Sequence, residues 1–221
     1  MAVSAQASEK CIGVKEKMIN NLSVKIITRL EKRGQLSGED KEVIAFGLFF
    51  LLFNAYCFML SVIIGLVSKV VIEAIVFFFT FLLIKRYAGG VHASKEWLCI
   101  LLSSTGIVGT IALIKLCLSN QFIWITCFPF AFISALIICA LSPLENENKP
   151  LNQNDVKRYR KLSIIRIIFT CVLLIVLLIL NCKRIACPIM AALMFESILI
   201  IVGYLQKIKR RVDKKMQFCS K

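Results

Sequence analysis

The chain has few groups that could carry polar chemistry. One histidine stands among 221 residues, and 13 acidic residues face 28 lysines and arginines. One imidazole leaves too few ligands for a metal site unless scattered acids such as Glu73 and Glu96 converge, so we expect no metal and no cofactor. The first 42 residues contain no apolar core, and we therefore expect no cleavable signal peptide. Neither a repeat at solenoid period nor a low-complexity tract is evident.

Apolar residues dominate instead. They make up 58% of the chain, the mean hydropathy is +0.80, and long runs lack charge. This pattern predicts an all-α, polytopic membrane protein. Of the ten cysteines, several lie inside apolar runs, where we interpret them as small buried residues rather than disulfide partners: Cys57, Cys117, Cys127, Cys139 and Cys171.

The net charge of +15 does not indicate nucleic-acid binding. Its basic residues flank apolar segments, and they form no basic face interleaved with aromatic residues. We expect no nucleic acid as a partner, and we assign the charge to membrane topology and to the anionic lipid of the inner leaflet.

The sequence predicts about six transmembrane helices. The apolar segments are, in order, residues 43–67, 70–84, 98–118, 122–142, 164–182 and 185–205. The second has only about fifteen residues and carries Glu73, so it is the weakest span, either tilted in a hairpin with the first or lining a polar cavity. We divide the chain into an N-terminal segment (1–42), a transmembrane domain (43–205) and a basic tail (206–221).

In the N-terminal segment, Ile19, Leu22, Ile26 and Leu30 recur at helical spacing among basic residues. This predicts a cytoplasmic amphipathic helix, lying on the inner leaflet, on a partner's helix or on the protein's own loops. Across the whole chain, alternate connections between the segments carry 23 lysines and arginines on one side and 3 on the other. The positive-inside rule then places both termini, and the connections around His92 and after Pro143, in the cytoplasm.

Chemistry concentrates in residues 85–99, where His92 precedes Cys99 by seven positions. A cysteine attacks as thiolate, so a neighbouring imidazole base would activate it. On an unbroken helix this spacing corresponds to roughly 10.5 Å of rise, too far for a hydrogen bond. Gly89 and Gly90 provide a break, and a contact between two subunits of a homodimer would also close the gap. Alternatively, His92 is a solvated loop residue and Cys99 a small buried one.

Other polar residues near this loop suit supporting roles. Lys85 and Arg86 add positive potential, and the amides after Gly89 and Gly90 could donate to an oxyanion. Arg86 could bind an acidic peptide segment, although contact with lipid phosphate is the commoner role of arginine at a membrane edge. Glu73 and Glu196, both within apolar segments, are candidates to orient His92 or to pair with Lys115 or Arg166.

Two motifs resemble those of a known family. The string Arg-Tyr-Ala-Gly-Gly-Val-His at residues 86–92, followed after six residues by Cys99, is similar to the signature of the accessory gene regulator B (AgrB) peptidases. The string Ser-Pro-Leu-Glu-Asn-Glu-Asn-Lys-Pro-Leu at residues 142–151 resembles a second stretch of that family. With the basic N-terminal segment and the six-segment layout, the resemblance covers nearly the whole chain.

The resemblance implies an integral membrane cysteine endopeptidase of the bacterial cell membrane, with Cys99 as nucleophile and His92 as general base. Its partner would be the precursor of an autoinducing quorum-sensing peptide, from which it removes the C-terminal tail through an acyl-enzyme that then yields a thiolactone or lactone. Two other functions stay open: a peptide transporter that uses the intramembrane acids, and a noncatalytic scaffold, which would need no histidine at this spacing from a cysteine.

Overall fold

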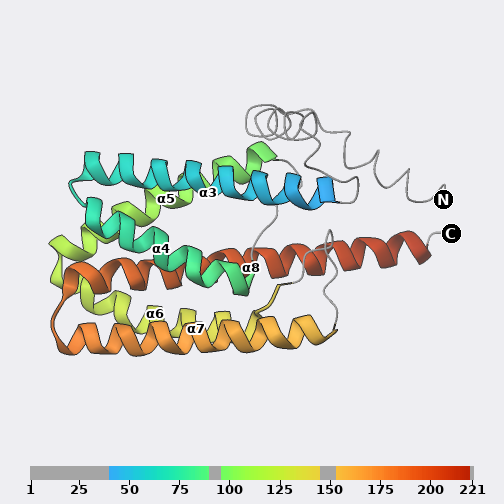
Figure 1. Ribbon diagram of the computed structural model, residues 1–221. Coiled ribbons are helices and arrows are strands. Elements are labelled where there is room, and N and C mark those ends of the chain that lie inside the picture. Colours follow the sequence, from blue (N-terminus) through green and yellow to red (C-terminus); the bar gives the residue numbers. More distant parts are fainter. Residues whose placement is uncertain (1–39, 90–95, 145–152, 220–221) are drawn as a thin grey trace.

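The computed structural model describes residues 40–89, 96–144 and 153–219, and every regular element among them is a helix. The six helices are α3 (Asp40–Ser68), α4 (Val71–Ala88), α5 (Glu96–Ser119), α6 (Gln121–Leu141), α7 (Gln153–Ile179) and α8 (Lys183–Cys219). Their long axes run along one common direction in a bundle (Figure 1). The predicted all-α class is confirmed, whereas the amphipathic helix predicted for the N-terminal segment lies outside the described residues.

Five of the helices are long and apolar enough to cross a membrane, so this is a multi-pass membrane protein. The exception is α4, which corresponds to the segment predicted to be the weakest span. Its 18 residues include Glu73, Lys85 and Arg86. At about 1.5 Å per residue it is still roughly 27 Å long, close to the thickness of the hydrocarbon layer.

Packing explains how α4 tolerates these charges. It contacts α3, α7 and α8, and one of its faces is fully covered, with Ala74, Phe77 and Ala88 at 0% exposure. The central helix is α8, whose membrane span is 67% buried, against 22–33% for the other four spans. In contrast, Leu51, Val67, Phe122, Leu136 and Ile179 lie exposed on the bundle, as lipid-facing residues do.

Short turns join the helices at one end of the bundle. Lys69 connects α3 to α4 with a φ of 60°, and Asn181 precedes α8 with a φ of 55°. Asn120 connects α5 to α6, and its side chain accepts a hydrogen bond from the backbone N–H of Phe122 as an N-cap does. The opposite end is formed by the C-terminal ends of α4 and α6 and the N-terminal ends of α5 and α7. We call it the motif end, because the described parts of the two motif stretches, residues 86–89, 96–99 and 142–144, belong to it.

Candidate functional site

At the motif end, α4 stops where the sequence predicts a break. Gly89 follows the last helical residue with a φ of 83°, and its N–H donates to the carbonyl of Lys85 at 3.2 Å. Side chains other than glycine rarely adopt this left-handed conformation, so Gly89 suits the end of the helix. Gly90 and His92 lie outside the described residues.

Cys99 lies near the N-terminal end of α5, which begins at Glu96. His92 therefore belongs to the connection between α4 and α5, as the spacing argument requires. The side chains of His92 and Cys99 are both outside the described residues, and their pairing stays a prediction.

The two motifs meet through their backbones. Beyond α6, the N–H of Leu144 donates to the carbonyl of Ala88 at 3.0 Å. A Cβ atom on Gly89 would stand 2.7 Å from the Leu144 carbonyl oxygen and 3.1 Å from its nitrogen. Glycine at position 89 therefore meets two requirements: it allows the left-handed φ, and it leaves room for the backbone of Leu144. The start of the 142–151 stretch is fixed directly against the end of α4.

A polar contact holds this stretch to α7 as well. The Ser142 and Ser163 hydroxyls lie 2.9 Å apart, and both side chains are buried. Ser142 also ends α6, since its N–H donates to the carbonyl of Ile138. The described start of the second motif therefore links α4, α6 and α7, and it does more than terminate a helix. Residues 145–152 lie outside the described residues.

Lys85 and Arg86, predicted together as supporting residues, face different surroundings. The Lys85 ammonium lies 5.0 Å from the centroid of the Phe81 ring and interacts electrostatically with Glu196. Arg86 is exposed, and its guanidinium lies 5.7 Å from the Tyr87 ring centroid. Successive residues point about 100° apart around a helix, so only one of the two can face the bundle interior.

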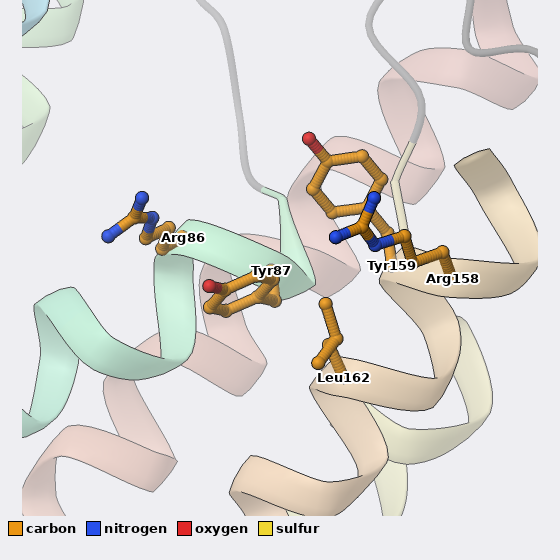
Figure 2. A pocket seen from close by; sticks show the side chains of 5 residues that line it. All are labelled: Arg86, Tyr87, Arg158, Tyr159 and Leu162. Carbon is orange, nitrogen blue, oxygen red and sulfur yellow. The ribbon is translucent and has the colours of Figure 1, made fainter.

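Beside Arg86 the structure has a cavity of about 300 Å³. Its lining residues come from α4 and α7: Arg86, Tyr87, Arg158, Tyr159 and Leu162. Figure 2 shows Arg158 reaching from α7 toward the α4 side, with Tyr87 and Leu162 between the two helices. The Tyr87 and Tyr159 rings lie 6.2 Å apart, and the Arg166 guanidinium lies 5.0 Å from the Tyr87 ring. The result is a basic, aromatic cavity at the motif end.

Sequence reasoning missed Tyr87, Arg158 and Tyr159 as parts of a site. Arg158 entered only as one of the positive charges that set the topology. A signal was present, because a basic-aromatic string, Arg158-Tyr159-Arg160, precedes an apolar segment on the same side as the Arg86-Tyr87 pair. Only the packing of α4 on α7 brings the two pairs together.

The two intramembrane acids, Glu73 and Glu196, differ in their surroundings. Glu73 forms an ion pair with Arg184, with Oε1 2.9 Å from Nε, so its predicted pairing with Lys115 or Arg166 is wrong. Because α4 and α8 start at the same end of the bundle, Glu73 in the first turn of α4 meets the first turn of α8. Glu196 is fully buried, and neither of its carboxylate oxygens has a hydrogen-bond partner among the described residues.

None of the described cysteines within the apolar runs forms a disulfide, as the sequence predicts. The sulfur atoms of Cys117 on α5 and Cys127 on α6 lie 3.4 Å apart, and both side chains are buried. In the part of the chain that the structure describes, no three side chains of His, Cys, Asp or Glu are grouped to hold a metal ion.

Comparison with known proteins identifies the family. A protein-family model described as Accessory gene regulator B matches residues 23–200. AgrB-like protein 2 of Clostridium perfringens strain 13 is 28% identical over 192 residues, which cover 80% of this chain and 87% of the relative. An AgrB-like protein of C. perfringens strain SM101 is 29% identical over 161 residues, covering 68% and 72%. An AgrB-like protein of Listeria innocua is 30% identical over 135 residues, covering 60% and 65%.

No solved structure matches this chain. The matched region contains residues 86–99 and 142–151, and it extends over the helices from α3 to the first half of α8. The chain therefore belongs to the accessory gene regulator B family, and its membership supports a role in the agr quorum-sensing system.

Proposed function

We propose that this protein is an integral membrane cysteine endopeptidase that removes the C-terminal tail of an autoinducing-peptide precursor. Cys99 is the nucleophile and His92 its general base. The family match supports the proposal, because it includes the whole His92 to Cys99 motif. The helix boundaries also support it, since Cys99 lies near the N-terminal end of α5 and His92 lies in the chain between two helices.

The reaction starts at the thiol. His92 takes the Cys99 proton, and the thiolate attacks the carbonyl carbon of the scissile peptide bond. The developing oxyanion accepts hydrogen bonds from amides after Gly89 and Gly90. The C–N bond breaks, the leaving amine takes the proton from the imidazolium, and the precursor remains bound as a thioester.

The second half of the reaction closes the ring. An internal thiol or hydroxyl of the precursor gives its proton to His92 and attacks the thioester carbonyl. The bond to the Cys99 sulfur breaks, and the leaving thiolate takes the proton back from the imidazolium. The product is a thiolactone or a lactone, and the enzyme is regenerated. A thioester keeps much of its acyl reactivity, so this transfer is favoured over hydrolysis when the internal nucleophile is held close and water is excluded.

The other supporting residues follow the same proposal. Arg86 binds the acidic part of the precursor from the rim of the basic cavity, while Lys85 faces Glu196 and positions the end of α4. The N-terminal dipole of α5 assists ionisation of Cys99, because the residue lies in the first described turn. The termini and the motif end lie in the cytoplasm, where a newly made precursor is found. A homodimer with a shared His–Cys site is compatible with the seven-residue spacing.

Cleavage of a tagged precursor tests the assignment. Purified full-length protein in lipid vesicles should shorten the precursor, and Cys99→Ala or His92→Ala should abolish the shortening. Cys182→Ala is the matched control, because Cys182 is an exposed cysteine beyond the far end of α7. A precursor without its internal nucleophile should accumulate as a hydroxylamine-sensitive adduct on Cys99. Normal cleavage by Cys99→Ala would refute the proposal.

A peptide transporter is the second candidate, and the buried, unpartnered Glu196 is the observation that favours it. Intramembrane carboxylates often mark proton or substrate pathways. A transporter would keep moving peptide across vesicles after Cys99→Ala and lose this activity after Glu196→Gln. The endopeptidase proposal instead expects Cys99→Ala to abolish precursor cleavage and Glu196→Gln to retain it.

A further inference from the structure

Two cavities follow one another along the groove between α4 and α7. The first is the basic cavity described above. The second has a volume of about 340 Å³ and lies deeper along the same two helices. On α4, Arg86 and Tyr87 line the first cavity and Leu83 lines the second. On α7, Leu162 lines the first cavity, and Ile165 and Phe169 line the second. The groove is therefore polar at the motif end and apolar toward the middle of the bundle.

Positive charge accumulates at the polar part of the groove, where the described residues provide no acidic counter-charge. Arg86 and Arg158 line the first cavity, and Arg166 lines the second. The Arg166 guanidinium lies over Tyr87, so it sits where the two cavities adjoin. Among the residues that the structure describes, no acidic side chain lines either cavity and no ion pair involves any of these arginines. An anionic ligand would complete the charge balance.

The apolar part faces the membrane. Phe169 is 64% exposed and Leu83 52% exposed, although both lie within the bundle's apolar band. On its inner side the second cavity is closed by Ile189 of the central helix α8, which is almost fully buried. The groove is therefore open toward the lipid and closed toward the protein interior.

We propose that the α4–α7 groove is a specific binding site for an anionic glycerophospholipid. The phosphate lies in the first cavity beside Arg158, the glycerol ester region lies at Arg166, and one acyl chain follows Leu83 and Phe169. Basic pockets between transmembrane helices on the cytoplasmic side recognise anionic headgroups in this way. An acidic peptide would use the first cavity alone, whereas a phospholipid accounts for both cavities and for their order.

This site does not depend on the endopeptidase proposal. Native mass spectrometry of the full-length protein in detergent, titrated with phosphatidylglycerol or phosphatidylcholine, tests it. We expect one saturable phosphatidylglycerol and at least tenfold weaker phosphatidylcholine binding. Arg158→Gln removes one charged contact and should weaken phosphatidylglycerol binding by about tenfold.

Arg160→Gln is the matched control, because Arg160 is exposed on the same helix and lines neither cavity. It removes the same charge and should change the affinity by less than about twofold. Equal losses in Arg158→Gln and Arg160→Gln would mean that general surface charge attracts the lipid, and they would overturn the proposal. Equal binding of phosphatidylglycerol and phosphatidylcholine would also overturn it.

A fluorescence measurement locates the acyl chain. Phe169→Trp places a reporter in the second cavity, and phosphatidylglycerol brominated on its acyl chain should quench it more than brominated phosphatidylcholine does. Adding Arg158→Gln should remove the difference, while circular dichroism reports that the helices are retained. The proposal fails if glycerol phosphate alone binds as tightly as the lipid. It also fails if an acidic hexapeptide occupies the first cavity and no acyl quenching occurs.

Discussion

At the scale of single residues, the motif end depends on positions where a small change has a large physical effect. Gly89 combines a left-handed φ with contact to the Leu144 backbone, so its hydrogen atom cannot be replaced without moving one of two chain segments. Tyr87 lies among Arg86, Arg166 and Tyr159, and it connects the basic cavity to the groove below.

Gly89→Ala should destabilise the protein by about 1–3 kcal/mol, because a Cβ atom is strained at this φ and would collide with the Leu144 carbonyl. The thermal unfolding midpoint in detergent measures the loss. Gly47→Ala is the control: Gly47 lies within α3, nothing stands within 4 Å of its added Cβ, and helix propensity favours alanine there. Equal midpoints for the two variants would contradict the close backbone contact.

The cleavage rate should depend on pH through His92. A free histidine titrates at a pKa of about 6.5, and its protonated form has no lone pair with which to accept the Cys99 proton. The rate should therefore fall as the pH decreases through the imidazole pKa, and initial rates of precursor cleavage between weakly acidic and neutral pH measure it. A flat profile would argue against His92 as general base.

At the scale of helices, the contact between α4 and α8 organises the bundle. The two helices run in the same direction, and Glu73 forms an ion pair with Arg184 near one end. Twelve residues further along each helix, Lys85 and the buried Glu196 stand at the same register. Between these pairs the Phe195 ring of α8 packs against Phe77 and Phe81 of α4, with centroids 6.2 and 5.2 Å away. Charged residues such as Glu73 and Lys85 would be unfavourable on a helix surrounded by lipid. They are compatible with α4 because other helices cover it.

Gly106 of α5 should be sensitive to substitution. A Cβ atom there would stand 2.4 Å from the Phe195 ring, whose movement is restricted by Phe77 and Phe81. We expect Gly106→Ala to cost about 1–3 kcal/mol, measured by thermal unfolding. Adding Phe195→Leu should recover part of the loss as a coupling energy.

Gly109 provides the control for this substitution. It lies one turn further along α5, and nothing stands within 4 Å of an added Cβ. Gly109→Ala should leave the midpoint unchanged or raise it slightly, since alanine favours the helix. If the double variant of Gly106 and Phe195 shows purely additive effects, the two helices do not approach as closely as the structure indicates.

At the scale of the whole molecule, the bundle separates a basic end from an end with few charges. The turns at Lys69, Asn120 and Asn181 join helices at one end, while both motifs belong to the other. The uneven distribution of lysine and arginine predicts that the motif end faces the cytoplasm. A precursor made inside the cell would then reach the proposed active site without crossing the membrane.

Labelling of cysteines in intact cells tests this orientation. Cys182, exposed in the turn between α7 and α8, should react with a membrane-impermeant maleimide from outside. Cys182→Ser should abolish that labelling. A variant that keeps only Cys219 should react after permeabilisation and not before. Reaction of Cys219 in intact cells would place the basic tail outside and reverse the topology.

Much of the fold follows from the sequence because hydropathy is a local property. Each of the six apolar segments corresponds to a helix. The fifteen-residue segment that contains Glu73 corresponds to α4, which is the helix not long and apolar enough to cross a membrane by itself. Helix ends were less predictable. The fifth apolar segment starts within a longer helix, because α7 already begins at Gln153. The sixth stops within a longer helix, because α8 continues to Cys219. In both cases polar residues extend the helix beyond the apolar band.

The sequence by itself determined the fold class, the break at Gly89 and the family motifs, because each depends on neighbouring residues along the chain. The partners of residues far apart were decided only by tertiary packing: Glu73 with Arg184, Gly89 with Leu144, and Arg86 with Arg158 across one cavity. A hydrophobic pattern specifies that a helix buries a face, but not which helix covers it. The basic groove between α4 and α7 exists only because that choice brings two short basic-aromatic strings side by side.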